Sequence, residues 1–219
     1  MSDPVPSQPP GKAIVIAVDG PAASGKGTIA RALAAHFGLP HMDTGLLYRA
    51  VALNLVQFGG DPANVFEAVR ACDLGSMSLD DPELRSELVG SYASRISAYP
   101  AVRAHLLDRQ RAFAAQIGGA VLDGRDIGTV IAPDATVKLF VTATAQVRAQ
   151  RRLAELTARG LNAHYDEVLA DIHARDERDA GRKTAPLVRA SDALLLDTSD
   201  LDVTQAIAAA LALVEGHLA

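Results

Sequence analysis

Hydrophobic residues along this chain fall into short continuous runs separated by stretches with helical spacing. Ala13–Val18 is such a run, rich in β-branched residues, and the segment after it carries apolar residues at helical spacing from Ile29 to Phe37. Continuous apolar strands that alternate with helices indicate a parallel sheet covered on both faces. The sequence therefore predicts an α/β fold with a central parallel five-stranded sheet. We expect its strands near 13–18, 39–43, 119–123, 136–142 and 192–198.

Residues 44–118 carry no convincing strand pattern. The stretch 80–97 has a helix-capping Asp81 followed by Pro82 in the first turn, and 100–117 repeats apolar residues every three or four positions. We therefore expect a mainly helical insertion at about 44–118, between core segments 13–43 and 119–219. Together they form one domain, 13–219. It follows a Pro-rich N-terminal segment, 1–12, that we expect to be a disordered tail.

Composition narrows the class of protein. The chain of 219 residues has no apolar run long enough to span a membrane, and its first dozen residues lack the apolar region of a signal peptide. The single cysteine, Cys72, rules out an internal disulfide, and no cluster shows zinc-ligand spacing, so we expect a cytoplasmic protein. A net charge of −5 argues against general attraction to nucleic acid or membranes.

Most of the basic residues are arginines rather than lysines. All 21 are arginine apart from Lys12, Lys26, Lys138 and Lys183. Guanidinium groups grip phosphate bidentately, so one interpretation is a phosphate-rich site. The other is coding bias toward arginine and alanine, and only the positions of the arginines can decide between the two.

The first strand leads into a glycine-rich loop, within the string VDGPAASGKGTIA from Val18 to Ala30. The P-loop pattern of a Gly, four residues, Gly and Lys is present, but Gly27 stands where the pattern has Ser or Thr, and Thr28 follows. Backbone N–H groups and the positive end of the next helix can bind phosphate here, and Lys26 adds a mobile charge. The alternative is a glycine-rich turn with a solvated lysine. The predicted phosphate-binding residues are Gly20, Pro21, Ala22, Ala23, Ser24, Gly25, Lys26, Gly27 and Thr28.

Arginines gather at three further places. Arg49 lies one turn inside a helix opened by Thr44. Arg125 and Asp126 follow a strand, at the sheet edge where open α/β folds bind ligands. A helix with Arg148, Arg151 and Arg152 leads into a segment at about 153–168, which we expect to be a short mobile lid with Gly160 as its flexible point. For Arg49 and the group from Arg148 to Arg152, the residues alone favour solvated helix surface.

A fourth group lies on the predicted helix 165–183. Its apolar stripe begins at Val168 and Ile172 and continues through Arg175, Asp179 and Arg182, with Arg178 beside it. A core-facing stripe that becomes charged indicates an enclosed polar cleft. A solvated helix of alternating charge explains the same pattern, and the residues alone leave both interpretations open.

Five strings together resemble the bacterial cytidylate kinase family: DGPAASGKGT, DTGLLYR, YPAVRAHLLDRQRAF, DGRDIGTV and RDERDAGR followed by APL. The resemblance runs from about Ile14 to the C-terminus. DTGLLYR combined with DGRDIGT is its most specific part, while the GKGT form is shared with adenylate kinases. It implies a P-loop kinase fold and transfer of the ATP γ-phosphoryl group to CMP or dCMP with Mg²⁺, by a monomer. The ion would be held mainly by substrate oxygens and water, with Thr28 as the candidate protein contact.

The resemblance also implies roles for the residues. Arg49, Arg125 and Arg182 resemble the clamp on the acceptor phosphate, and Arg151 or Arg152 resembles a lid arginine that closes over the transferring group. Ser94, Arg103 and Asp126 resemble cytosine contacts, and Arg175 with Asp179 resembles the ribose contacts. The implied catalytic residues are Lys26, Arg125, Arg151, Arg152 and Arg182. The implied acceptor-binding residues are Thr44, Tyr48, Arg49, Ser94, Arg103, Arg125, Asp126, Arg175, Arg178, Asp179 and Arg182.

One region departs from the family pattern. Bacterial members often carry a longer acceptor-domain insertion with β-strands, whereas 59–99 is short here and has a helical pattern. Two other functions stay open: another small P-loop kinase, acting on AMP, UMP or a non-nucleotide acceptor, and a nucleotide-binding switch that acts through partners. The string DGRD weighs against the first, and the absence of an [NT]KxD guanine signature weighs against the second.

Overall fold

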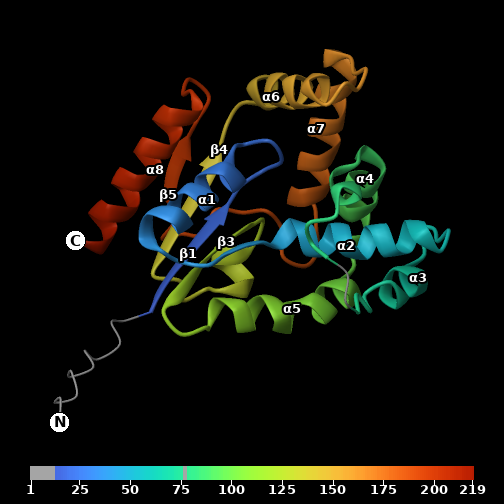
Figure 1. Cartoon of the computed structure of the whole chain (residues 1–219), viewed down its shortest axis with the longest axis horizontal. Coiled ribbons are helices and arrows are strands. Elements are labelled where there is room, and N and C mark those ends of the chain that lie inside the picture. The colour runs from blue at the N-terminus through green and yellow to red at the C-terminus, as the bar shows by residue number, and fades with distance from the viewer. Residues whose placement is uncertain (1–12, 76–77) are drawn as a thin grey trace, which may run out of the picture.

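The computed structural model describes residues 13–75 and 78–219, so the predicted tail at 1–12 lies outside the described residues. Its centre is a five-stranded sheet in the order β2-β3-β1-β4-β5, and every neighbouring pair is parallel (Figure 1). The predicted α/β class and five-stranded parallel sheet are therefore confirmed. The strands are β1 (Ile14–Asp19), β2 (His41–Asp43), β3 (Gly119–Gly124), β4 (Val137–Thr142) and β5 (Leu194–Asp197).

Alternation along the strands divides the core between the two faces of the sheet. Ile16 and Val18 of β1 pack with α1 (Lys26–Phe37) and α8 (Val203–Leu218) on one face. Ala17, between them, faces the other way and packs with Ala120 and Leu122 of β3 against α5 (Pro100–Ala114) and η2 (Ile127–Ile131). Because successive strand residues point to opposite faces, both layers of helices are needed to bury the sheet.

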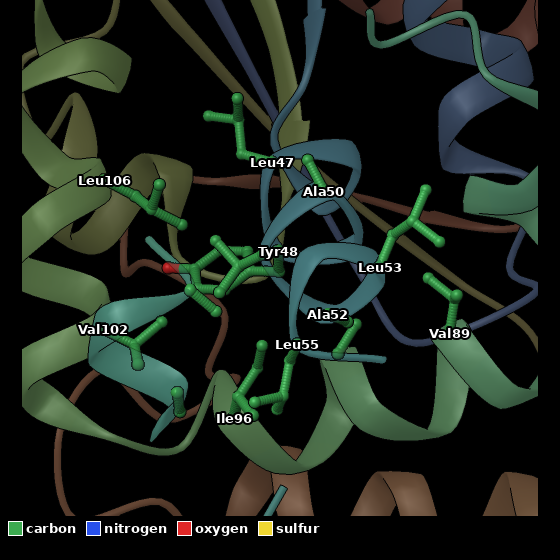
Figure 2. Packing of buried hydrophobic residues seen from close by; sticks show 14 of the residues in the cluster. Leu47, Tyr48, Ala50, Ala52, Leu53, Leu55, Val89, Ile96, Val102 and Leu106 are labelled. Carbon is green, nitrogen blue, oxygen red and sulfur yellow. The ribbon is translucent and has the colours of Figure 1, made fainter. Parts of the chain in front are cut away.

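The segment between β2 and β3 is helical, as predicted, and it has no strand within its described parts, 44–75 and 78–118. It forms its own core around α2, where Leu47, Leu53 and Leu55 are fully or almost fully buried (Figure 2). The stretch that we expected to begin as one helix at Pro82 is broken instead. A short 3₁₀ turn ends at Arg85, and Ser86 then caps a new helix by accepting from the Val89 N–H. The helical elements here are α2 (Thr44–Gln57), α3 (Val65–Arg70), η1 (Pro82–Arg85), α4 (Glu87–Ile96) and α5 (Pro100–Ala114).

Helices α6 (Ala145–Ala158) and α7 (Tyr165–Ala180) form a hairpin beside the sheet, and α7 reaches back to α4 of the insertion (Figure 1). The predicted helix 165–183 ends earlier than expected, because its last residue is Ala180 and Gly181 caps it. Arg182 therefore lies beyond the helix rather than on its stripe. The predicted lid, 153–168, comprises the end of α6, the connection 159–164 and the first turn of α7; its closure stays a prediction.

Candidate functional site: a P-loop facing an arginine-lined cavity

The loop from Gly20 to Gly25 joins β1 to α1 in the manner of a phosphate-binding loop. A side chain at Gly20 is excluded, because its Cβ would lie 2.0 Å from the Val141 carbonyl oxygen. Gly25 is the N-cap of α1 with φ of 90°, a left-handed conformation that glycine adopts without strain. In the described part of the chain no side chain caps α1, so its first N–H groups and its positive dipole end are available to an anion.

Lys26 begins α1 and lines the cleft above this loop. Burial lowers the pKa of its ammonium group to about 8, and repulsion by Arg125 acts in the same direction. Asp123 and Asp43, near the ends of the neighbouring strands β3 and β2, attract the charge and oppose the shift. The Lys26 ammonium group therefore loses its proton more readily than a free lysine does. A bound polyanion would stabilise its charged form.

Two carboxylates face the loop from across the cleft. Asp43 and Asp123 are paired in register on β2 and β3, and both line the cleft with Lys26. Burial raises the pKa of Asp43, and the neighbouring Asp123 raises it further. His41 Nε2 lies 2.7 Å from Asp123 Oδ1 and holds that carboxylate from the side. The pair is a local concentration of negative charge beside a loop built for anions, which is an arrangement suited to an intervening cation.

A polar cavity adjoins this cleft. Its walls come from α2, α4, α5, α7 and the turn after β3, so distant parts of the sequence converge here. The lining residues are Thr44, Gly45, Tyr48, Arg49, Gly90, Ala93, Ser94, Ser97, Arg103, Gly124, Arg125, Asp126, Arg175, Asp179 and Arg182. All the predicted acceptor-binding residues belong to this set except Arg178, whose Nε donates to Ser94 Oγ at 3.1 Å. Sequence reasoning did not identify Gly45, Gly90, Ala93, Ser97 and Gly124, which present backbone or small side chains.

Five charged groups of this cavity are already paired with one another, namely Arg103, Arg125, Asp126, Asp179 and Arg182. Arg103, which is 8% exposed, bonds to Asp126. Asp179 accepts from Arg125 Nε at 2.7 Å and also bonds to Arg182. Burial raises the pKa of Asp126 because its arginines do not fully offset desolvation, whereas the arginines around Asp179 outweigh its burial and lower its pKa. The network stays buried without a large uncompensated charge, and it presents guanidinium groups to the cavity.

Arg49 stands between the cavity and the cleft and lines both. Its Nη1 donates to the Leu84 carbonyl at 2.7 Å, which joins α2 to η1. Burial lowers its pKa to about 10, and Arg175 and Arg152 lower it further. The solvated surface that the residues alone favoured for Arg49 is therefore wrong, because this guanidinium is partly buried among other cations. Such a cluster is stabilised by an anion bound between its members.

The three arginines of α6 occupy different environments. Arg148 is 5% exposed and makes a bidentate pair with Asp176 of α7 at 2.9 and 2.6 Å, so solvated surface is wrong for it too. Arg151 is engaged with the loop after β5, donating to Thr198 Oγ1 at 2.9 Å and to the Thr198 carbonyl at 2.6 Å. Arg152 lines the cleft and bonds to Glu87 of α4 and to Glu155. Of the two predicted lid arginines, Arg152 is the one that lines the cleft.

A third hollow adjoins the P-loop cleft, and the sequence did not predict it. Its walls are largely apolar and come from α1, α6 and the start of α8. Leu201, Val203, Ala206 and Ile207 contribute the hydrophobic surface. At its edge, Asp202 caps α8 in a capping box with Gln205. An apolar hollow next to a phosphate-binding loop can accept a flat ring.

Comparison with known proteins identifies the family. Residues 16–216 match the family described as Cytidylate kinase. The chain is 60% identical to the cytidylate kinase of Xanthobacter autotrophicus over 94% of this chain and 99% of the relative, and 58% identical to that of Azorhizobium caulinodans over 92% and 98%. A crystal structure of an uncharacterized protein from Eubacterium ventriosum has a TM-score of 0.56 at 14% identity, covering 94% of this chain and 99% of that one, and so supports the fold alone. No helix within residues 13–75 and 78–219 is both long and apolar enough to cross a membrane.

Proposed function

Because the chain belongs to the cytidylate kinase family, we propose that it transfers the γ-phosphoryl group of ATP to CMP or dCMP, forming ADP and CDP or dCDP. One observation carries this proposal beyond the family name: the P-loop cleft and the arginine-lined cavity open into each other. They share the residues Gly45, Arg49, Gly124, Arg125 and Arg175. An acceptor in the cavity would therefore meet donor phosphates held on the loop.

The cavity fits a cytosine nucleotide in its chemistry. Its two ends differ, since Arg49, Arg125 and Arg175 line its junction with the cleft, while Arg103 and Asp126 do not reach the cleft. We assign the acceptor phosphate to the first end and the base to the second. Cytosine presents an N4 amine next to its N3 and O2 acceptors, and a carboxylate with a guanidinium complements that edge. Uracil would place a carbonyl against Asp126, so we expect UMP to be the poorer acceptor.

We assign ribose recognition to the charged C-terminal end of α7. Arg175 and Asp179 lie one turn apart on the helix and both line the cavity. Arg178 fits the same role less directly, because it binds Ser94 and so ties α7 to α4. The carboxylate of Asp179 is held by Arg125, which also belongs to the phosphate end. Sugar and phosphate recognition would therefore be coupled through one side chain.

The donor nucleotide would span the loop and the apolar hollow. That hollow shares Ala23, Gly25, Thr28, Arg152 and Glu155 with the cleft. One nucleotide could therefore place its base in the hollow and its phosphates in the cleft. The β- and γ-phosphates would lie on the N–H groups at the start of α1 beside Lys26. This leaves Arg152 above the transferring group and gives Arg151 a supporting role, holding the loop after β5.

Mg²⁺ fits the residues present. The ion prefers oxygen ligands and keeps several waters, so it needs only one or two carboxylates in addition to substrate phosphates. Asp43 and Asp123, whose like charges repel each other on neighbouring strands, would hold it, together with substrate oxygens and the hydroxyl of Thr28. When bound, the ion would supply charge neutralisation at the donor phosphates.

The chain's own residues then act by position and charge. An acceptor phosphate oxygen forms a bond to the γ-phosphorus while the bond between that phosphorus and the β–γ bridging oxygen breaks, and ADP leaves. The acceptor is already an anion, so no side chain has to remove a proton from it. Lys26 and Arg152 would stabilise charge on the migrating group, and Arg49, Arg125 and Arg182 would cancel the repulsion between the two polyanions.

The test is an assay of ADP release with ATP and Mg²⁺, offering CMP, dCMP, UMP, AMP, GMP and shikimate in turn. We expect strong turnover with CMP and dCMP and weak turnover with UMP. Turnover that is equal for all acceptors, or ADP release that needs none, would contradict the proposal and favour another P-loop kinase or a nucleotide switch. A cytoplasmic monomer remains our expectation, and sedimentation of the purified chain tests its oligomeric state.

A further inference from the structure

A buried carboxylate that none of the assigned roles uses lies between the P-loop and the cytosine end of the cavity. Asp19 is the last residue of β1 and is 5% exposed. Its Oδ1 accepts the Ile127 N–H at 2.8 Å, and its Oδ2 accepts the Gly128 N–H at 2.8 Å. Both donors belong to η2, the single turn that follows Asp126. Each carboxylate oxygen is therefore committed to the backbone of that turn.

The position of Asp19 is costly for an ionised group. Burial raises its pKa to about 6 although both backbone hydrogen bonds and the charge of Lys26 favour the ionised form, and nearby Asp126 raises it further. The residue makes no salt bridge within the described chain, and a charge buried without a counter-ion destabilises a fold unless hydrogen bonds compensate it. The two N–H groups of η2 are that compensation.

The chain connects Asp19 directly to both halves of the site. The residue after it, Gly20, begins the phosphate-binding loop, and the residue before Ile127 is Asp126, which faces the base. Asp19 also pairs in register with Gly124, so the ends of β1 and β3 are fixed side by side beneath the turn. The room around the turn is small, because a Cβ at Gly128 would lie 3.1 Å from the Lys138 side chain and 3.4 Å from Asp19 Oδ2.

We propose that Asp19 is a positioning residue, which fixes the turn carrying Arg125 and Asp126 and thereby sets the selectivity for the acceptor base. This inference rests on the proposed function. Asp19 touches neither base nor phosphate in this account; it acts by holding Asp126 at the depth where that carboxylate meets the cytosine amine. The Asp19 side chain also connects the loop that holds the donor with the turn that contacts the acceptor base.

The variant Asp19→Asn tests the proposal. The amide has the size of the carboxylate, but its NH₂ faces one of the two N–H donors, so that hydrogen bond is lost. We expect the KM for CMP to rise about tenfold, in line with one lost hydrogen bond to a charged group. We expect the preference for CMP over UMP, measured as the ratio of kcat/KM values, to fall by a similar factor, while the KM for ATP changes less than twofold.

Val214→Ala is the matched control for loss of stability. Val214 is fully buried in α8 on the face of the sheet opposite η2, so its truncation weakens the core without touching the turn. We expect this variant to lower the Tm and keep the CMP preference. If Asp19→Asn keeps the CMP preference of the wild type, or raises the KM for ATP as much as that for CMP, the positioning role is overturned.

Hydrogen exchange of the wild-type chain gives a second measurement that needs no variant. The amides of Ile127 and Gly128 should be protected as strongly as those of β3, because both donate to a buried acceptor. Rapid exchange at these two amides would overturn the proposal. An absence of CMP turnover in the wild-type chain would instead contradict the proposed function, and the exchange result would stand independently of it.

Discussion

The arginine-lined cavity and the apolar hollow both adjoin the P-loop cleft, yet they are built by different means. The cavity draws charged side chains from α2, α5, α7, the turn after β3 and the segment after α7, and its two carboxylates, Asp126 and Asp179, are paired with arginines before any ligand is present. The hollow is largely apolar, with aliphatic side chains from the start of α8 beside residues of the loop, α1 and α6. In this account the acceptor is chosen by the geometry of hydrogen bonds and charge, and the donor by its phosphates and the shape of its base.

The difference has an energetic consequence. Polar groups that would be left unpaired by a wrong base reject it strongly, whereas an apolar surface discriminates only weakly between rings of similar size. Arg103 and Asp126 are held by each other and by the fold, so little ordering remains to be done when the base enters. We therefore expect substitutions in the cavity to change which acceptor is used, and substitutions in the hollow to change how well the donor binds.

The largest expected effect comes from Lys26 in the P-loop cleft, which adjoins both the cavity and the hollow. Lys26→Met removes the charge at the transferring group, and we expect kcat to fall about 100-fold or more, as for other lost electrostatic donors. Lys183→Met is the matched control, because Lys183 is exposed and lines none of the three hollows. Turnover by Lys26→Met within tenfold of the wild type would remove Lys26 from its assigned role.

The next largest effect should be on acceptor selectivity, which only the cavity determines. Asp126→Asn keeps the shape of the side chain but offers an NH₂ group to the base, and we expect kcat/KM for CMP to fall about 30-fold, the scale of a hydrogen bond to a charged group. UMP should lose less, because its carbonyl accepts from that amide. The KM for ATP should stay within twofold. Equal losses for CMP and UMP would show that Asp126 does not read the base.

The pH dependence of the donor side should follow Lys26. Its pKa of about 8 lies below the usual 10.5, so the free enzyme loses this charge as pH rises through 8, and kcat/KM for ATP should fall about tenfold per pH unit above it. Between pH 8 and 10.5 the unfolded chain binds more protons at this group than the native one, so its contribution to stability grows with pH. Activity should therefore fall without a matching fall in Tm. A flat profile from pH 7 to 10 would contradict this.

The smallest expected effect is in the apolar hollow. Leu201→Ala removes part of its hydrophobic surface, and a side chain half-buried by a ligand contributes about 1 kcal/mol, so the KM for ATP should rise about fivefold. The KM for CMP should not change. A rise in the KM for CMP that equals the rise for ATP would mean that the hollow is not a separate donor site.

The sequence predicted these two regions unequally, for a physical reason. The loop, the turn with Arg125 and Asp126 and the charged end of α7 are local patterns with a direct chemical meaning, and the structure brings them together. The apolar hollow was missed because aliphatic residues that line a ligand site have the same spacing as residues that pack a core. Arg148 and Arg49 were taken for surface because their partners, Asp176 and the Leu84 carbonyl, are distant in the sequence.

Two predicted helix boundaries were wrong because they too depend on packing between distant segments. Ser86 breaks the stretch that begins at Asp81 into two elements, and Gly181 ends α7 two residues before the last predicted one. Both residues were visible as capping types, but whether a helix stops at such a residue depends on what the next segment packs against. Arg182 is placed in the cavity by that stop, since it bonds to Asp179 after the chain has left the helix.

In the proposed function, donor and acceptor occupy two joined cavities of one chain at the same time. Its most direct test is titration calorimetry with adenosine and cytidine joined through five phosphates, compared with ATP, with CMP and with the analogue that carries two adenosines. We expect one molecule bound per chain, at least 100-fold more tightly than ATP alone because the second half binds intramolecularly, and weaker binding of the two-adenosine analogue. Two molecules per chain, or an affinity no better than that of ATP, would contradict it.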